Sequence, residues 1–415
     1  MDIRLVMAAM AQRVGANGQL GLVRAQQPEN APALAVVGGP FDMSSLSSDH
    51  EAVRAGQITI AHDGAVTLHR PLVIWESAEL LVSGGVDLAL DRASGAFLLN
   101  LGGLTVSDAG VSAIGDASQS SPAFRPFVLT AGVGAVQVVK GRFEGLGYAD
   151  SAAFGGFAVV NRGIFPAIGE SRVEESDFDD LSSVLFEGSR GATFRKNWVR
   201  DTRGAGLILK QTIETEVSGN RVQTSALHGI RISSGATGAR VRGNRIEDAG
   251  KIGIFVDGAS RNVDLEGNRV SGAKGDGILV KRSGCIRVRG NSVRTSGGNG
   301  IVIHRSTSVA LNGNAIERNR RAGILLRNQP AGAETSVTEN ILAANTSGIS
   351  GEASARIRLI GNDFSEQFPR LVAGDLALGA HGLFADPAGQ LPIVLEPAGG
   401  KPSAPPPPCP IIEGA

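Results

Sequence analysis

Aromatic side chains are scarce in this chain. They make up 4% of its 415 residues, with one tyrosine, Tyr148, and two tryptophans, Trp75 and Trp198. The hydrophobic share of 42% is still ample for a folded core. That core must be built mainly from Val, Ile, Leu and Ala, which suits thin layers of parallel strand whose buried residues are aliphatic.

Cysteine, net charge and long apolar runs are equally limited. Cys285 and Cys409 lie in no spaced metal-binding pattern, so we expect neither a disulfide framework nor a zinc site. The 40 basic and 40 acidic residues cancel, and we expect no nucleic acid partner. No apolar run is long enough to span a bilayer, so we expect no membrane insertion.

The start of the chain, MDIRLVMAAMAQRVG, lacks the basic region and long apolar stretch of a signal peptide. Two alternatives remain at this point. The protein is cytoplasmic, or its targeting segment is not part of this sequence.

Glycine is abundant, with 57 residues, and the chain repeats. A Gly-Asn or similar step recurs every 22–26 residues, at Asn197, Asn220, Asn244, Asn268, Asn291, Asn314, Asn340 and Asn362. Glycine followed by an aliphatic residue recurs every 23–25 residues, at Gly206, Gly229, Gly253, Gly277, Gly300, Gly323 and Gly348. Two independent markers with one period indicate about seven stacked coils.

Each repeat, such as Arg240–Ser260, reads as short alternating strands between glycine and asparagine turns. Such a unit buries its apolar face only by stacking on its neighbours. We predict an all-β, right-handed parallel β-helix with coils of ~23–24 residues and an N-terminal cap. The recurring asparagines should stack as a hydrogen-bonded ladder. A leucine-rich repeat would need a leucine-dense consensus and a helical segment, which are absent.

The predicted organisation has three parts. Residues 1–70 form an irregular capping region with a short amphipathic helix, which would protect the edge of the first coil. Residues 71–370 form the β-helix, and its first coils, such as Pro71–Asp91 and Gly134–Gly145, are the less regular ones. Residues 371–415 form an irregular segment that ends in a Pro-rich tail.

One face of the coils could carry chemistry. Counted from the repeating glycine, positions +1 and +3 are aliphatic and should point inward, so positions +2 and +4 should point outward. Position +4 is polar and mainly cationic: Lys210, Ser233, Asp257, Lys281, His304 and Arg327. Position +2 is apolar except at Arg231: Ile208, Phe255, Leu279, Val302 and Leu325. Arg282 and Arg305 follow position +4 and add charge at the rim.

Cations one coil apart predict a groove that follows the carboxylates of an acidic polysaccharide. The predicted substrate-binding residues are Asp257, Lys281, Arg282, His304, Arg305 and Arg327. For any single residue, a solvated sheet face is the plainer interpretation. The scarcity of aromatic residues argues against stacking on neutral sugars and favours recognition by charge and hydrogen bonds.

Several segments carry a family resemblance: GAFLLN (Gly95–Asn100), FRPFVLTAG (Phe124–Gly132), GLGYADS around Tyr148, HGI at His228 and the G-I-x-V repeats. From about Leu34 to Gly332 the chain resembles the periplasmic mannuronan C5-epimerases of bacterial alginate pathways, which are right-handed β-helices. The resemblance implies an acidic polysaccharide as partner, an exopolysaccharide export complex as a second one, and a periplasmic or secreted location.

The family's catalytic motif, Tyr-Gly-Ile/Phe-Asp-Pro-His-Asp/Glu, corresponds here to Ala205–Gln211. The tyrosine, both acids and the histidine are absent, and the family's arginine one coil later falls on Ser234. Asp257 does match an acidic position of the family. The resemblance therefore implies the fold but not the epimerase machinery.

Abstraction of the proton beside a uronate carboxylate requires a base and a group that stabilises the developing charge. Lys210 stands where the family has its histidine, and Arg231 follows about one coil later. We predict this pair as catalytic, because it resembles the arrangement in β-helical polysaccharide lyases that use lysine as base. The intermediate can be reprotonated, which is epimerisation, or it can expel the glycosidic oxygen, which is β-elimination.

Two other functions remain open. A non-catalytic polysaccharide-binding or export-scaffold protein would explain the missing motif. A glycoside hydrolase would need converging acids, but Asp257 and Glu187 lie three coils, or roughly 14 Å, apart, so this hypothesis ranks lowest. No calcium-binding repeat is present, and we predict no cofactor. Binding of a single Ca²⁺ ion by an acidic residue of the groove stays an open alternative. We expect a monomer.

Overall fold

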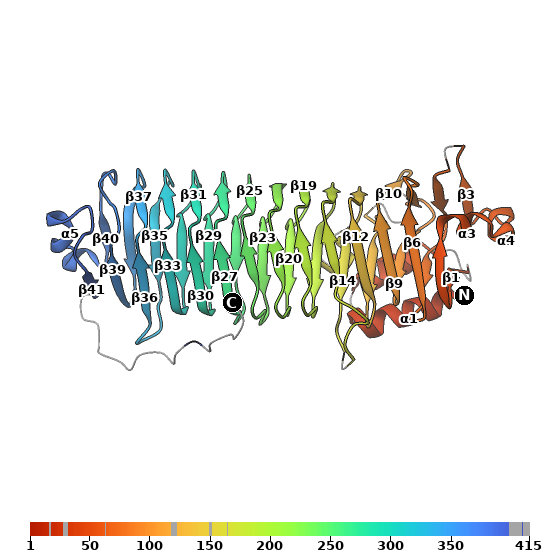
Figure 1. Ribbon diagram of the computed structural model, residues 1–415, viewed down its shortest axis with the longest axis horizontal. Coiled ribbons are helices and arrows are strands. Elements are labelled where there is room, and N and C mark those ends of the chain that lie inside the picture. Colours follow the sequence, from red (N-terminus) through yellow and green to blue (C-terminus); the bar gives the residue numbers. More distant parts are fainter. Residues whose placement is uncertain are drawn as a thin grey trace. The chain divides into compact units, whose positions relative to one another are not determined.

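Short strands separated by turns run through the chain, as the repeat predicts (Figure 1). The computed structural model describes residues 1–15, 18–27, 32–62, 64–117, 123–148, 152–163, 165–397 and 409. The predicted tail, apart from Cys409, and the end of the GLGYADS segment lie outside these residues. The chain divides into an N-terminal unit, Met1–Ile208, and a C-terminal unit, Leu209–Ala415.

Three sheets of stacked strands form the N-terminal unit. The first contains β1 (Leu34–Val36), β5 (Leu72–Ile74), β8 (Leu98–Asn100), β11 (Val128–Ala131), β14 (Gly156–Val160) and β17 (Ser183–Glu187). The second contains β3 (Ile58–Ile60), β4 (Val66–Leu68), β7 (Leu88–Asp91), β10 (Gly110–Ile114), β13 (Arg142–Glu144), β16 (Asp177–Asp179) and β19 (Trp198–Thr202). The third contains β2 (Gly39–Asp42), β6 (Ala78–Ser83), β9 (Gly103–Ser107), β12 (Ala135–Val139), β15 (Arg172–Glu174) and β18 (Thr193–Arg195).

The C-terminal unit repeats this plan. Its first sheet contains β23 (Ile230–Ser233), β26 (Ile254–Val256), β29 (Ile278–Lys281), β32 (Ile301–His304), β35 (Ala322–Arg327), β38 (Ser347–Glu352) and β40 (Val372–Gly374). Its second contains β22 (Arg221–Ser225), β25 (Arg245–Glu247), β28 (Arg269–Ser271), β31 (Ser292–Arg294), β34 (Ala315–Glu317) and β37 (Ile341–Ala343). Its third contains β21 (Glu216–Ser218), β24 (Arg240–Arg242), β27 (Arg261–Glu266), β30 (Gly284–Arg289), β33 (Thr307–Asn312), β36 (Glu334–Thr338), β39 (Arg356–Ile360) and β41 (Ile393–Leu395). Strand β20 (Leu207–Lys210) contains the boundary between the units.

Neighbouring strands within these sheets pair in parallel, one coil apart in sequence, as β26 and β29 do. Antiparallel pairing occurs near the two ends of the chain, between β3 and β4 and between β39 and β41. The predicted parallel β-helix is therefore confirmed. Strand pairing begins at β1, before residue 70, so the boundary between cap and helix remains a prediction.

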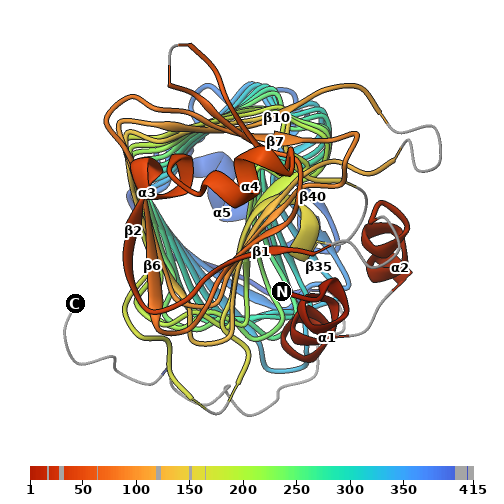
Figure 2. The ribbon, with the colours of Figure 1, turned by 90° about the vertical axis from the view of Figure 1, so that its right-hand side faces the viewer.

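The α-helices of the described chain lie near its two ends, and one of the two 3₁₀ turns, η1, lies between β13 and β14. The helices are α1 (Ile3–Val14), α2 (Gly18–Ala25), α3 (Met43–Ser47), α4 (His50–Arg54), α5 (His381–Ala385) and the 3₁₀ turns η1 (Ala152–Phe154) and η2 (Ala377–Gly379). Helix α1 lies outside the first sheet of the N-terminal unit (Figure 2). Its buried residues, including Val6 and Met10, pack in one cluster with outward-facing side chains of that sheet, such as Val73 and Leu99.

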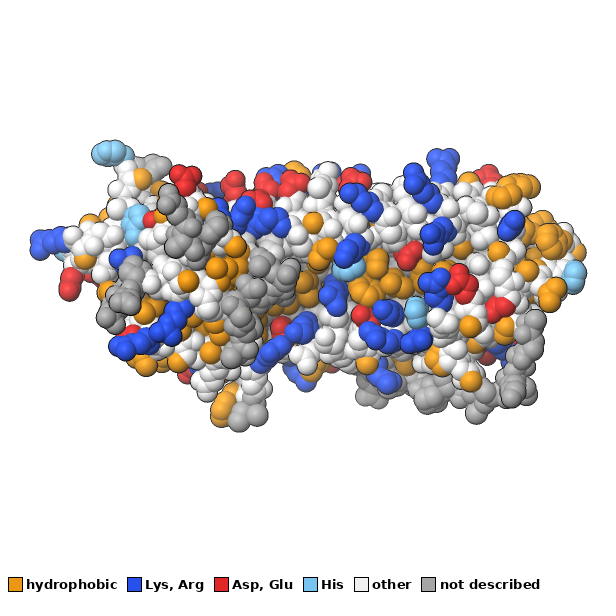
Figure 3. Space-filling model, turned by 180° about the vertical axis from the view of Figure 1, so that it is seen from behind, with side chains coloured by type: hydrophobic (Ala, Val, Ile, Leu, Met, Phe, Trp, Pro, Cys, Tyr) orange, Lys and Arg blue, Asp and Glu red, His pale blue; other side chains and the backbone are white. Residues whose placement is uncertain are grey.

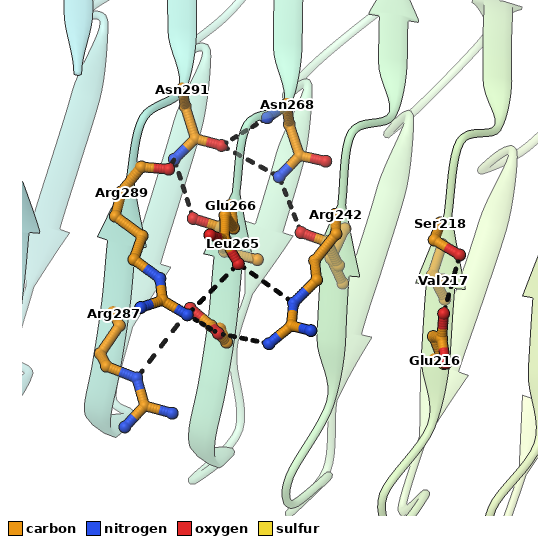
Figure 4. Close-up of polar contacts among 12 residues, drawn as sticks. Glu216, Val217, Ser218, Arg242, Leu265, Glu266, Asn268, Arg287, Arg289 and Asn291 are labelled. Atoms are coloured by element: carbon orange, nitrogen blue, oxygen red, sulfur yellow. Dashed lines mark hydrogen bonds and ion pairs between the residues drawn. The ribbon is translucent and has the colours of Figure 1, made fainter. Parts of the chain in front are cut away.

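The predicted asparagine ladder is present in the C-terminal unit. Seven buried asparagines continue one another coil by coil: Asn220, Asn244, Asn268, Asn291, Asn314, Asn340 and Asn362. Asn268, for example, donates its amide to Asn291 Oδ1 at 2.9 Å and to the Val241 carbonyl at 2.8 Å (Figure 4). These contacts satisfy the polar groups of a buried turn, which explains why the residue recurs.

Charged side chains also link coils on the outside of the third sheet. Asp264, of which 3% of the side chain is exposed, contacts Arg242 at 3.2 Å and Arg289 at 2.8 Å, and both arginines are labelled in Figure 4. Both arginines also contact Glu266, at 3.1 and 3.2 Å. Because acid and base alternate from strand to strand, this network holds β24, β27 and β30 in register.

Candidate functional site

The first sheet of the C-terminal unit places alternate residues inside and outside the coil. Inward positions +1 and +3 are fully buried: Ile254, Val256, Ile278, Val280, Ile301, Ile303, Ile324 and Leu326. The outward residues form two parallel rows. We call position +4, from Lys210 to Glu352, the polar row, and position +2, from Phe255 to Leu325, the apolar row. Both rows match the pattern predicted from the sequence.

The polar row is held in register by strand pairing. Lys281 pairs with His304, and His304 pairs with Arg327. The next residue of the row is Glu352, which pairs with Arg327. Since parallel strands lie about 4.8 Å apart, their side chains repeat at roughly that interval. The predicted binding residues Lys281, His304 and Arg327 are therefore brought together.

The start of the polar row is placed by backbone hydrogen bonds. The N–H of Gln211 donates to the Ser233 carbonyl at 3.1 Å, so Lys210 lies beside Ser233. The N–H of Asp257 donates to the Ile232 carbonyl at 2.8 Å, so Asp257 continues the row one coil later. Lys210 is thus in register with Ser233, two residues along the strand from Arg231.

The apolar row consists of Phe255, Leu279, Val302 and Leu325, which occupy successive strands. Three of them keep only a small exposed fraction: 8% for Phe255, 3% for Val302 and 5% for Leu325. On this face, apolar side chains form a stripe flanked by Lys, Arg and His side chains (Figure 3). Arg231 begins the same row on β23, as predicted.

His304 lies in a strongly cationic environment. Burial is the main cause that lowers its pKa, and the neighbouring positive charges lower it further. Those charges belong to Lys281, Arg305, Arg327 and Arg282. The structure therefore places the two rim arginines close enough to act on the row.

Asp257 is one of the two acids of the polar row, and it is already engaged. Its Oδ1 accepts the N–H of Gly258 at 2.7 Å and lies 3.1 Å from Arg282. The exposed fraction is 11% for the Asp257 side chain and 55% for that of Arg282. Arg282 takes a left-handed backbone conformation, with φ of 48°, at the turn that ends β29. This turn directs the guanidinium back toward Asp257.

A second cluster surrounds Phe255. The guanidinium carbon of Arg231 lies 5.7 Å from the centre of the Phe255 ring, and the His228 ring lies 5.0 Å from it. Burial, with the charges of Arg231 and Lys251, lowers the pKa of His228 to about 4. The charge of Asp257 opposes this change. At neutral pH the imidazole is therefore uncharged, between cations.

Three residues of the site were missed by the sequence reasoning. Glu352 follows Gly348 at position +4, so extending the repeat by one coil would have found it. His228 was noted only as part of a family segment, and Lys251 was not singled out. Both lie in turns just before the strand, outside the two positions that the alternation addresses.

Glu187, the acid that the glycoside hydrolase hypothesis considers together with Asp257, lies in the N-terminal unit. Glu187, on β17, pairs with Val160 on β14, and 5% of its side chain is exposed. Arg162 makes an ion pair with it. Glu187 is therefore a buried, partnered acid.

Another hollow lies on the third sheet of the N-terminal unit, with a volume of about 500 Å³. Its charged lining residues are Glu76 and Glu79. Glu76 is paired with Arg13 at 2.5 Å, and no Lys or Arg is among the described residues that line the hollow, so it does not share the character of the cationic face. Within the described residues, no group of three or more His, Cys, Asp or Glu side chains could hold a metal ion.

The expectation about cysteine was incomplete. Cys285 and Cys409 form a disulfide, with 5.4 Å between their Cα atoms and 124 residues between them in sequence. The sequence spacing of two cysteines does not predict such a bridge, because it forms only where the folded chain brings Cys409 next to Cys285. No helix of the described chain is long and apolar enough to cross a membrane.

Comparisons with known proteins agree with the fold. Residues 160–293 and 238–376 match the family described as "Right handed beta helix region", and these overlapping matches span more than half of the chain. A search of curated proteins finds no matching sequence.

Solved structures of similar fold include the periplasmic alginate epimerase AlgG, with a TM-score of 0.69 and 18% identity over 88% of this chain and 90% of that one. The A-module of Azotobacter vinelandii mannuronan C-5 epimerase AlgE4 has a TM-score of 0.52 and 14% identity, over 82% and 94%. At these identities the likeness concerns the fold, and it confirms the resemblance found in the sequence.

Proposed function

The chain belongs to the right-handed β-helix family, and from this premise we propose that it binds and processes an acidic polysaccharide along the first sheet of its C-terminal unit. The proposed reaction is abstraction of the C5 proton of a uronate residue, followed by epimerisation or β-elimination. The structurally similar AlgG is titled an alginate epimerase, which makes a uronate polymer the first substrate to test.

One observation carries this proposal: the basic side chains of Lys281, His304 and Arg327 stand in register beside an unbroken apolar row. From β29 to β35, each coil offers one basic and one apolar side chain, so each could hold one sugar by its carboxylate and its ring face. A surface evolved only for solubility would not need an apolar row next to its cations.

Proton abstraction would involve three tasks. Lys210 would act as the base, and a lysine can do so only where its surroundings favour loss of its proton. Arg231 would stabilise the charge that develops on the carboxylate when the C5–H bond breaks and its electron pair moves toward that group. Asp257, Lys281, Arg282, His304, Arg305 and Arg327 would bind the neighbouring sugars.

The alternative is a polysaccharide-binding or export-scaffold protein without catalysis. It is favoured by one specific observation: Ala205–Gln211 lacks the tyrosine, acids and histidine of the epimerase motif. Under this alternative the two rows would guide the polymer, and no bond of the polymer would be broken.

We also propose a periplasmic or secreted location. The Cys285–Cys409 disulfide supports it, because such bonds persist in oxidising compartments. The AlgG structure is titled periplasmic. We propose, in the same way, that an export complex is a partner and that the protein is a monomer.

The test is an incubation of the purified protein with polymannuronate and other uronate polymers in D₂O, followed by proton NMR. Loss of the H5 signal or new unsaturated ends would support proton abstraction. Line broadening without chemical change would favour the scaffold. Neither effect with any polymer would contradict both.

A further inference from the structure

His228, Arg231 and Lys251 form a cluster whose charges are not balanced. Among the described residues, neither Arg231 nor Lys251 makes an ion pair. Asp257 is the nearby acid, and it is engaged by Arg282 and by the N–H of Gly258. Two cations therefore share one site without a counter-ion of their own.

Two buried polar atoms of the same cluster also lack a partner in the described chain. They are Nδ1 of His228 and Nε of Arg231, and both side chains lie next to the Phe255 ring. A buried polar atom without a hydrogen bond costs about 1–3 kcal/mol. The cluster is thus kept at an energetic cost, which is typical of a binding site.

We propose that His228, Arg231 and Lys251 bind the carboxylate of one acidic sugar residue, and that His228 takes up a proton from solvent when this anion binds. The inference rests on the proposed function and deepens it, because it assigns the first sugar subsite of the groove. The anion supplies the missing counter-ion for both cations. It also removes the repulsion that keeps the imidazole uncharged.

The sign of the coupling follows from the surroundings of His228. In the free protein, burial and the charges of Arg231 and Lys251 lower its pKa to about 4, while Asp257 acts in the opposite direction. A bound carboxylate adds a second negative charge, so the pKa must rise on binding. By linkage, the affinity for the anion increases as the pH falls toward the pKa of the complex.

The direct test is an NMR pH titration of the histidine side chains with and without saturating sodium glucuronate, with His228 assigned by the His228→Gln variant. We expect the pKa of His228 to rise by about 1 or more, as for an opposite charge at close range. Arg231→Ala should weaken glucuronate binding by about tenfold or more. Arg269→Ala, an exposed arginine of the second sheet, should leave it unchanged.

Three outcomes would overturn the inference: no binding of glucuronate, no change in the His228 titration at saturation, or a change confined to His304. The polymer assay reports separately on the proposed function. If glucuronate shifts His228 but no polymer is bound or altered, the subsite stands and the polysaccharide function fails. If polymers are processed while His228 is unaffected, the function stands and the subsite fails.

Discussion

The guanidinium of Arg327 contacts the carboxylate of Glu352 on the next coil, at 2.5 Å. The two residues pair directly across β35 and β38, so the cationic part of the polar row ends at this ion pair. Glu352 thus competes with any polymer carboxylate for Arg327.

Removal of this competitor should strengthen binding. We expect Glu352→Gln to raise the affinity for a uronate polymer by about two- to fivefold at low salt, since both side chains are about half exposed and screened. Titration calorimetry at two salt concentrations measures this. Glu317→Gln, on β34 of the second sheet, makes the same charge change and should have little effect. Equal effects of both variants would mean that net charge alone governs binding.

Lys210→Ala separates the catalytic hypothesis from the scaffold hypothesis. If Lys210 is the base, turnover should fall by about 100-fold or more while polymer binding is largely retained. Turnover is measured as loss of the H5 signal, and binding is measured separately. Arg269→Ala should retain turnover. An active Lys210→Ala protein would show that another group takes the proton.

Much of the fold was predictable because the repeat encodes it locally. Alternation between Ile278 and Lys281 determines which side chains point inward, and the spacing of Asn268 and Asn291 determines which turns stack. The alternation lies within one strand and the asparagine spacing repeats from coil to coil, so both can be read from the sequence without knowledge of distant contacts.

The site was predictable only in part, for a physical reason. Strand alternation predicts that side chains at position +4 point outward, so Lys281 and Arg327 could be found. His228 and Lys251 lie in turns, where the sequence does not determine the direction of a side chain. The Cys285–Cys409 bridge and the Asp257–Arg282 pair depend on three-dimensional proximity alone. Side-chain charge states depend on burial, which the sequence does not give.

The asparagine ladder should contribute strongly to stability. Asn268 is fully buried, accepts from the N–H and the amide of Asn244 at 3.0 and 2.9 Å, and donates to Asn291. Asn268→Ala should lower the free energy of unfolding by about 2–4 kcal/mol, because buried partners lose their hydrogen bonds. Urea denaturation measures this. Asn312→Ala, an exposed asparagine of β33, should cost less than about 0.5 kcal/mol.

The disulfide should stabilise the folded chain. It closes a loop of 124 residues, for which restriction of the unfolded chain gives up to about 4–5 kcal/mol. We expect the melting temperature to fall on reduction, and Cys409→Ser to melt at the lower temperature with or without reductant. Calorimetry checks both. An unreduced protein that melts as the reduced one does would show that the bridge adds no stability.

The pKa of His228 also predicts how stability depends on pH. Its folded-state pKa of about 4 lies below the usual value of 6.5, so the unfolded chain binds this proton more tightly. The neutral imidazole therefore costs no stability above pH 6.5, and stability is lost as the pH falls from 6.5 toward 4, by about 3 kcal/mol at most.

Urea denaturation of the wild type and of His228→Gln from pH 7 to pH 4.5 measures this dependence. The variant should lose less stability on acidification, because all other titrating groups are shared. His381→Gln, which removes an exposed histidine, should follow the wild type. Identical slopes for wild type and His228→Gln would mean that the imidazole is not held neutral by its surroundings, and the charge coupling argued for the subsite would lose its basis.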